Sequence, residues 1–109
     1  RGFAAAGADL NAQDDYGWTA LRYAVRARQL KTAGALLELG ANADLASNTG
    51  RTPLMSAAAN GLADAVGLLL EAGADPRLKD NNGDTALDHA SRGGNIGSLA
   101  CRDLLSKAL

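Results

Sequence analysis

The chain has 109 residues, of which 47% are hydrophobic but only 4% aromatic, and its net charge is −1. A near-neutral chain without a block of basic residues lacks the charge that binding a nucleic-acid backbone requires, and no apolar run is long enough to span a bilayer. The single cysteine, Cys101, excludes an internal disulfide and a metal site built from several cysteines. Because the apolar residues are mostly Ala, Leu and Val, helix is favoured over strand.

The sequence repeats itself every 33 residues. At this shift, six sets of three identical residues align without a gap. The sets are Gly7, Gly40 and Gly73; Ala8, Ala41 and Ala74; Gly17, Gly50 and Gly83; Thr19, Thr52 and Thr85; Leu21, Leu54 and Leu87; and Ala24, Ala57 and Ala90. Such a period indicates a repeat protein, in which each unit buries its apolar face against its neighbours.

Residues 1–13 match only the end of a unit. Phe3 takes the position of Leu36 and Leu69, so residues 1–6 are interpreted as the tail of a second helix whose partner helix lies outside the sequence. We therefore assign residues 1–13 to a truncated N-terminal repeat and expect the parent protein to extend upstream. We expect a monomer, or weak self-association through this uncapped end.

Two complete units occupy residues 14–46 and 47–79. In each, polar residues precede a Gly that can adopt a turn conformation other residues resist. Thr52 then suits a helix N-cap, and Pro53 suits the first helical position because its missing N–H is not needed there. A short Ala-rich helix is expected over residues 53–59.

A second helix is expected in each unit after another turn. In the unit 47–79, apolar residues at three- and four-residue spacing define one buried face. They are Ala65, Val66, Leu69 and Leu70. Residues 80–109 are assigned to a last unit, whose second helix carries the polar residues Arg102, Asp103, Ser106 and Lys107. Polar residues there suit an outer face without a neighbour, as a C-terminal capping repeat needs.

The matched residues resemble the ankyrin-repeat consensus along nearly the whole chain. In the unit 47–79 the resemblance rests on Thr52-Pro53-Leu54, Ala57-Ala58, Gly61, Leu68-Leu69-Leu70 and Gly73-Ala74-Asp75. It implies an all-α ankyrin-repeat solenoid of stacked helix-turn-helix units joined by β-turn or hairpin loops. It also implies a module that binds another protein.

Two departures from the family pattern carry expectations of their own. The family usually has His three residues after the Thr, where it hydrogen-bonds the adjacent turn. Arg22, Met55 and Asp88 stand there instead, so the sequence does not predict the usual network between turns. Arg28 replaces the Gly that usually ends the first helix, so this turn is expected to find another conformation.

Two patterns that could indicate a ligand site are better explained by the repeat. Asp80, Asn82 and Asp84 alternate as at the start of a calcium loop, but the required Gly and Glu positions do not fit. The Gly-rich stretch 93–98 lacks both the Lys and the preceding strand of a phosphate-binding loop. We therefore expect no metal and no cofactor.

His89 and Cys101 are the only residues that suggest nucleophilic catalysis. No third group that would orient them is apparent in the sequence. Cys101 is expected to be a buried thiol, and His89 to lie in line with Tyr23 and Ser56, on a face that the family leaves partly open. The sequence therefore predicts no catalytic residue.

The candidate partner-binding residues are positions that stacking does not dictate. They lie at the turn tips and along the exposed face of the first helices, which form a concave binding surface in ankyrin proteins. They are Asp15, Tyr16, Trp18, Arg26, Asn48, Thr49, Arg51, Asn60, Asn82, Asp84 and Arg92. Trp18 takes the place of Arg51 and Asp84, so we expect it to be exposed; the alternative is that it folds against the open N-terminal end. Trp, Tyr and Arg dominate interface hot spots.

Taken together, these features predict a non-catalytic protein–protein interaction module, acting as a regulator or scaffold in the cytoplasm. No nucleic-acid binding and no membrane insertion are expected. A second hypothesis is that the chain is the accessory segment of a larger enzyme or channel whose catalytic part lies upstream. The identity of the partner cannot be derived from these residues.

Overall fold

The computed structural model describes residues 10–93 and 96–109. Within these ranges the chain forms helices and no strand. The helices are α2 (Ala20–Arg26), α3 (Leu30–Glu38), α4 (Pro53–Ala59), α5 (Ala63–Glu71), α6 (Ala86–Gly93) and α7 (Ile96–Ala108). The predicted all-α solenoid is confirmed, whereas the helix tail expected over residues 1–6 lies outside the described residues.

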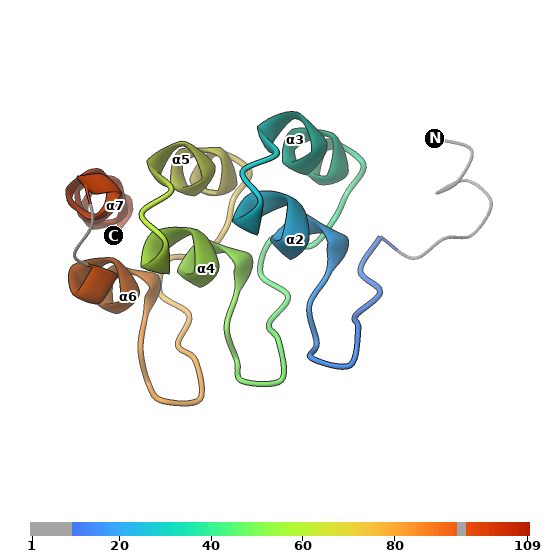
Figure 1. Cartoon of the computed structure of the whole chain (residues 1–109), viewed down its shortest axis with the longest axis horizontal. Helices are drawn as coiled ribbons and strands as arrows, with labels where there is room; N and C mark the ends of the chain where they lie inside the picture. The colour runs from blue at the N-terminus through green and yellow to red at the C-terminus, as the bar shows by residue number, and fades with distance from the viewer. Residues whose placement is uncertain (1–9, 94–95) are drawn as a thin grey trace.

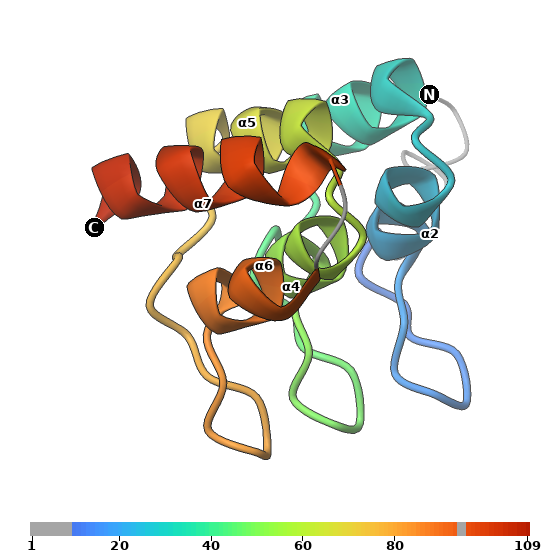
Figure 2. The same cartoon turned by 60° about the vertical axis from the view of Figure 1, so that its left-hand side comes forward.

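The helices stack as three pairs in two rows (Figure 1). The inner row consists of α2, α4 and α6, and the outer row of α3, α5 and α7. Each helix contacts its partner in the pair and its neighbour in the same row. A hairpin loop precedes each inner helix, and the three hairpins project side by side from the inner row (Figures 1 and 2).

The three inner helices begin in the same way. The hydroxyl oxygen of Thr19 accepts the backbone N–H of Arg22 at 3.3 Å, and Thr52 and Thr85 accept the equivalent N–H groups at the same distance. These side-chain caps satisfy backbone donors that the first helical turn leaves unpaired. The three Thr residues therefore occupy equivalent settings.

The core lies between the two rows and is built largely from small residues. Ala57, Ala65 and Ala90 are fully buried, which lets neighbouring helices approach closely. Met55 fills the core with 1% of its surface exposed. Cys101 is buried as well, and this burial raises the pKa of its thiol, which keeps the thiol protonated and unreactive at neutral pH.

The last helix presents a mainly polar outer side. The four polar residues expected there are all exposed: Arg102, Asp103, Ser106 and Lys107. The ammonium of Lys107 lies 3.3 Å from the Asp103 carboxylate, one helical turn away. Leu99 is a large apolar residue on the same helix, with 71% of its surface exposed.

The turn between α2 and α3 does not find another conformation, so that prediction is wrong. Arg28 adopts a left-handed φ of +61°, close to the +67° of Gly61 at the equivalent turn. Its backbone N–H donates to Val25, just as that of Gly61 donates to Ala58. The hydrogen bonds of the turn therefore impose the left-handed conformation on a residue that disfavours it.

Candidate functional site

The three hairpins share one hydrogen-bonded geometry. In the middle hairpin, the N–H of Ser47 donates to the carbonyl of Arg51 and the N–H of Gly50 donates back to Ser47, both at 2.9 Å. The same pair of bonds recurs over residues 14–18 and 80–84. The glycine of the middle hairpin has a φ of +79°, which explains why Gly recurs there.

Neighbouring hairpins are joined by two asparagines. The backbone N–H of Asn48 donates to the carbonyl of Tyr16, and its side-chain amide donates to the carbonyl of Asp15 at 2.7 Å. Asn81 repeats this arrangement on the next hairpin, with bonds to Thr49 and Asn48. These bonds hold the hairpins in one row, and they supply the link between turns that the sequence did not predict.

The predicted partner-binding residues all lie on the hairpins or the inner row. Those that are exposed are Asp15, Tyr16, Arg26, Asn48, Thr49, Asn82 and Arg92. Those that are half-buried are Trp18, Arg51, Asn60 and Asp84. Asn60 caps the end of α4 by donating its side-chain amide to the carbonyl of Ser56 at 2.7 Å, and so has a structural role.

Trp18 is half-buried, not exposed as expected, because Arg22 covers it. The central carbon of the Arg22 guanidinium lies 3.7 Å from the centroid of the Trp18 ring and 5.6 Å from that of Tyr23. Tyr23 in turn donates its hydroxyl to the Asp14 carboxylate. Sequence reasoning missed Arg22 and Tyr23 as candidate residues, although Trp18 directly precedes the N-cap Thr19, where a large side chain often packs against the start of the helix.

Two further arginines, Arg26 and Arg51, lie on the same face as Arg22. Arg26 is exposed and makes no hydrogen bond or ion pair within the part of the chain that the structure describes. Arg51 is half-buried and directs one guanidinium nitrogen to His89, at 3.3 Å. Burial lowers the pKa of Arg22, and the positive charges of Arg26 and Arg51 lower it further. Arg26 follows Arg22 by one helical turn on α2, and Arg51 takes the place of Trp18 on the neighbouring hairpin.

His89 is buried, with 7% of its surface exposed, so the expectation of a partly open position is wrong. Its Nε2 lies 2.8 Å from Oδ2 of Asp80. Because a guanidinium can only donate, Nδ1 must accept from Arg51, which places the imidazole proton on Nε2. His89 therefore connects the last hairpin to Arg51 of the preceding one.

Asp80 is the centre of this network. Its Oδ1 accepts the backbone N–H groups of Asn82 and Asp84, at 2.9 and 3.0 Å. Burial raises the pKa of Asp80, but the hydrogen bonds from the Asp84 N–H, the His89 ring and the Asn82 N–H lower it and prevail. The carboxylate therefore stays ionised and holds the hairpin in shape.

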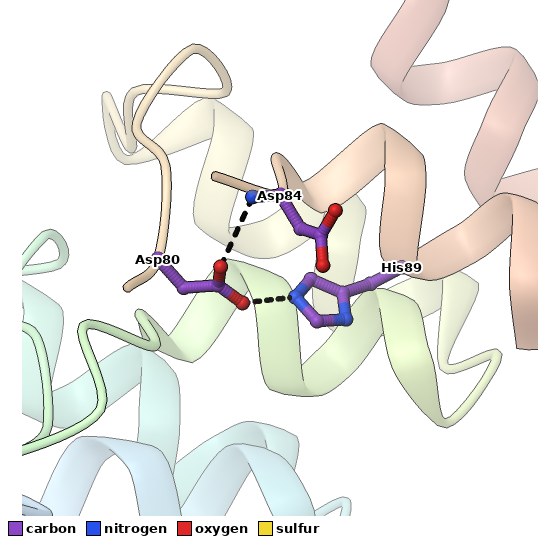
Figure 3. A group of neighbouring side chains, drawn as sticks. All are labelled: Asp80, Asp84 and His89. Carbon is purple, nitrogen blue, oxygen red and sulfur yellow. Dashed lines mark hydrogen bonds and ion pairs between the residues drawn. The ribbon is translucent and has the colours of Figure 1, made fainter. Parts of the chain in front are cut away.

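Asp80, Asp84 and His89 could each bring one ligand atom within 4.8 Å of the others (Figure 3). The Asp84 carboxylate is already paired with Arg92 through two bonds of 3.1 and 2.6 Å. Arg51 occupies the remaining nitrogen of His89. Because two guanidinium groups beside the cluster would repel a cation, we interpret it as a hydrogen-bond network and not as a metal centre.

A separate, shallow groove of about 350 Å³ lies in the outer row between α3 and α5. It is lined by Gly34, Leu37, Glu38, Leu68, Glu71 and Ala72. None of these is a predicted site residue, and they offer no nucleophile beside a base. Among the described residues, every helix is too short or too polar to cross a membrane.

Comparison with known proteins places this fold in a family. Residues 3–80 and, again, 40–108 match the family described as ankyrin repeats in three copies. The neurogenic locus Notch protein of Drosophila melanogaster is 48% identical over 56 residues, which cover 50% of this chain and 2% of that protein. The chain thus corresponds to a small part of the relative's length. With its three hairpins and three helix pairs in register, the chain belongs to the ankyrin-repeat family.

Proposed function

We propose that this chain binds a partner protein through its inner face. The inner face is defined as the hairpins 14–18, 47–51 and 80–84 together with the exposed sides of α2 and α6, which flank the buried helix α4. Ankyrin repeats are generally protein-interaction modules. A role as a cytoplasmic regulator or scaffold is a further part of the proposal.

One contrast carries the proposal. The residues that stacking requires are buried, or bonded to the neighbouring repeat, as Asn48 and Asn81 are. The inner face also carries residues that stacking does not require, such as Tyr16 with 70% of its surface exposed and Arg26 without a partner among the described residues. Tyr and Arg are frequent interface hot spots.

The rigidity of the hairpin row supports the same proposal. Hydrogen bonds within and between hairpins fix the backbone before a partner arrives. A surface ordered in advance loses less conformational entropy on binding than a flexible one. Binding needs no cofactor, metal or covalent step.

Affinity capture with matched baits tests the proposal. The baits are the wild-type chain, the double variant Tyr16→Ala/Trp18→Ala, and the outer-row variant Leu99→Ala as a control for loss of exposed apolar surface. We expect a protein that wild type and control retain but the double variant loses at least roughly tenfold, because interface aromatics commonly contribute more than 1 kcal/mol each.

Two checks make the capture decisive. Tyr16→Ala alone serves as a second inner-face bait, because Tyr16 is exposed and its removal does not disturb the stack of Arg22 on Trp18. Circular dichroism melts should show all baits folded. Retention of the same proteins by every folded bait would contradict binding through the inner face.

A second candidate function is that of an accessory segment in a larger protein, such as an enzyme or channel. The Drosophila relative favours it to a limited extent, because the matched segment is 2% of that protein. Sequencing the parent transcript upstream of Arg1 tests this candidate. An upstream reading frame encoding a catalytic or channel domain would support it, and a start codon close to Arg1 would contradict it.

A further inference from the structure

We infer that the partner docks an acidic segment, rich in Asp and Glu, on one part of the inner face. This part is the arginine–aromatic cluster, defined as Trp18, Arg22, Tyr23, Arg26 and Arg51. The inference rests on the proposed function and specifies the chemistry of the partner.

The cluster orders Arg22 in advance. Its guanidinium lies on the Trp18 ring, and its Nε donates to the buried hydroxyl of Ser56 at 3.4 Å. A guanidinium stacked flat on an aromatic ring keeps the donors in its own plane available. Arg22 is therefore held in place while its terminal nitrogens remain able to bind a carboxylate.

The charges of the cluster are not neutralised by the chain itself. No carboxylate forms an ion pair with Arg22, Arg26 or Arg51 in the described ranges 10–93 and 96–109. Two other arginines are paired, Arg28 with Asp64 at 2.8 Å and Arg92 with Asp84 at 2.6 Å, while Arg77 and Arg102 form no ion pair in the same ranges. The cluster is distinguished by bringing arginines without an ion pair together on the inner face.

Two carboxylates at the starts of the hairpins, those of Asp14 and Asp80, are engaged in other contacts. Asp14 accepts the Tyr23 hydroxyl and the backbone N–H groups of Tyr16 and Trp18. Asp80 accepts from His89 and from its own hairpin. Neither can turn toward the arginines without breaking the hydrogen bonds that hold its hairpin, so these two carboxylates do not form ion pairs with the cluster.

The packing of repeat against repeat does not require the cluster. Met55 and Asp88 occupy the positions equivalent to Arg22, and both helices keep the same Thr cap. Grouping three like charges costs free energy in the unbound chain, although Arg22 bonds to Ser56 and Arg51 to His89. A bound carboxylate would remove this repulsion and form charge-assisted, two-pronged hydrogen bonds with a guanidinium.

The surroundings favour a short acidic protein segment over a nucleic acid. Asp15, Asp84 and Asp88 lie on the hairpins and on α6, on the same inner face. A long polyanion leaving the cluster would meet these negative charges, and the chain carries a net charge of −1. A protein segment can instead place acidic residues at the arginines and an apolar residue against Tyr23.

Peptide binding to the full chain tests the inference. The probe is a fluorescein-labelled peptide of Glu and Asp residues around one central Leu, and the comparison peptide has Gln and Asn in their places. Fluorescence anisotropy at low and at physiological salt gives both dissociation constants. We expect the acidic peptide to bind at least roughly tenfold more tightly, since a charge-assisted hydrogen bond contributes about 1.5–3 kcal/mol.

Matched variants locate the binding. Arg26→Gln removes one positive charge from a side chain that has no partner among the described residues. The double variant Arg26→Gln/Arg51→Gln removes two positive charges. Arg102→Gln/Lys107→Gln removes two exposed charges from the outer row. The inner-face double variant should weaken acidic-peptide binding roughly tenfold and the outer-row variant less than about twofold, because separated exposed charges interact weakly.

Each other outcome overturns the inference. Equal affinity for the acidic and neutral peptides excludes charge as the basis of binding. Equal loss in both double variants means that only the net charge matters. A single-stranded oligonucleotide that binds as tightly as the acidic peptide, with the same dependence on Arg26 and Arg51, would identify a general polyanion site.

The result also separates this inference from the proposed function. If affinity capture yields a partner that depends on Tyr16 and Trp18 but the acidic peptide does not bind, the inner face binds proteins and the acidic chemistry is wrong. If the acidic peptide binds and no captured protein depends on the inner face, the proposed function fails.

Discussion

The first and third repeats have the same backbone arrangement but differ in how their charged side chains are paired. Five pairs of positions correspond, two repeats apart. They are Asp14 and Asp80, Trp18 and Asp84, Arg22 and Asp88, Tyr23 and His89, and Arg26 and Arg92. In the third repeat, each charged side chain of this set has a partner within the repeat. In the first repeat, Arg22 and Arg26 have no carboxylate partner among the described residues.

One hairpin position accounts for most of this difference. In the third repeat it is Asp84, which forms an ion pair with Arg92 on the following helix. In the first repeat it is Trp18, which cannot neutralise Arg26 and instead carries Arg22 on its ring. A single residue at the end of the hairpin therefore decides whether the inner face of a repeat is closed on itself or open to a partner.

Removing Asp80 should have the largest effect. Asp80→Ala leaves the buried ring N–H of His89 and two backbone N–H groups of the hairpin without their acceptor. We expect the free energy of unfolding to fall by about 3 kcal/mol, because a buried donor left unpaired costs its desolvation in addition to the lost hydrogen bond. Urea denaturation followed by circular dichroism measures the change.

The first repeat provides the control. Asp14 makes the equivalent contacts, but at an exposed position where water can replace them. Asp14→Ala should therefore reduce stability clearly less than Asp80→Ala. Equal losses would mean that the third repeat is no more closed than the first.

The pH dependence sharpens the role of Asp80. Its folded-state pKa lies below the ordinary value of 3.8, so its stabilising contribution is fully present above that value and is lost as the pH falls through the folded pKa. The difference in stability between wild type and Asp80→Ala should be constant near neutral pH and shrink below about pH 4. A constant difference down to pH 2 would contradict an ionised Asp80 as the hairpin's acceptor.

The middle and last hairpins should respond differently to the same substitution. Gly50 and Gly83 have φ values of +79° and +83°, so Ala is strained at both, by about 1–2 kcal/mol. A Cβ at Gly50 would lie 2.7 Å from the side-chain oxygen of Asn81, whereas nothing lies within 4 Å of one at Gly83. Gly50→Ala should therefore cost roughly 1–2 kcal/mol more than Gly83→Ala, measured by urea denaturation. Equal losses of stability would show that the neighbouring hairpin can shift away from the added Cβ at little cost in free energy.

Sequence periodicity predicted the backbone well because the backbone depends on local residues. The helix expected over residues 53–59 matches α4, and Thr52 and Pro53 begin it as expected. Periodicity failed where side chains meet across repeats. His89 bonds to Asp80 of its own repeat and to Arg51 of the preceding hairpin. No pattern within one repeat contains the contact with Arg51.

The stack of Arg22 on Trp18 was missed for a related reason. Aligning the repeats showed that Trp18 and Arg22 depart from the other units, which suggested exposure for Trp18. Two departures four residues apart can instead satisfy each other, and this holds here. The alignment identifies unusual positions, while their pairing follows from how the end of the hairpin meets the first turn of α2.

Arg28 should give a smaller effect, confined to one turn. Both Arg28→Gly and Arg28→Ala remove the exposed ion pair with Asp64, so their difference isolates the left-handed backbone. The Gly variant should be more stable than the Ala variant by about 1 kcal/mol. Urea denaturation of the two variants measures this difference. Equal stability would mean that the turn can rearrange, as the sequence had suggested.

The smallest expected effect tests the comparison of repeats directly. Asp84→Ala removes the carboxylate that neutralises Arg92, and so makes the third repeat resemble the first. Because a partly exposed ion pair contributes up to about 1 kcal/mol, we expect the acidic peptide to bind roughly threefold more tightly, with little change in stability. Fluorescence anisotropy with the same probe measures this. An affinity that falls or stays constant would mean that the open cluster of the first repeat, and not the charge of the whole inner face, limits binding.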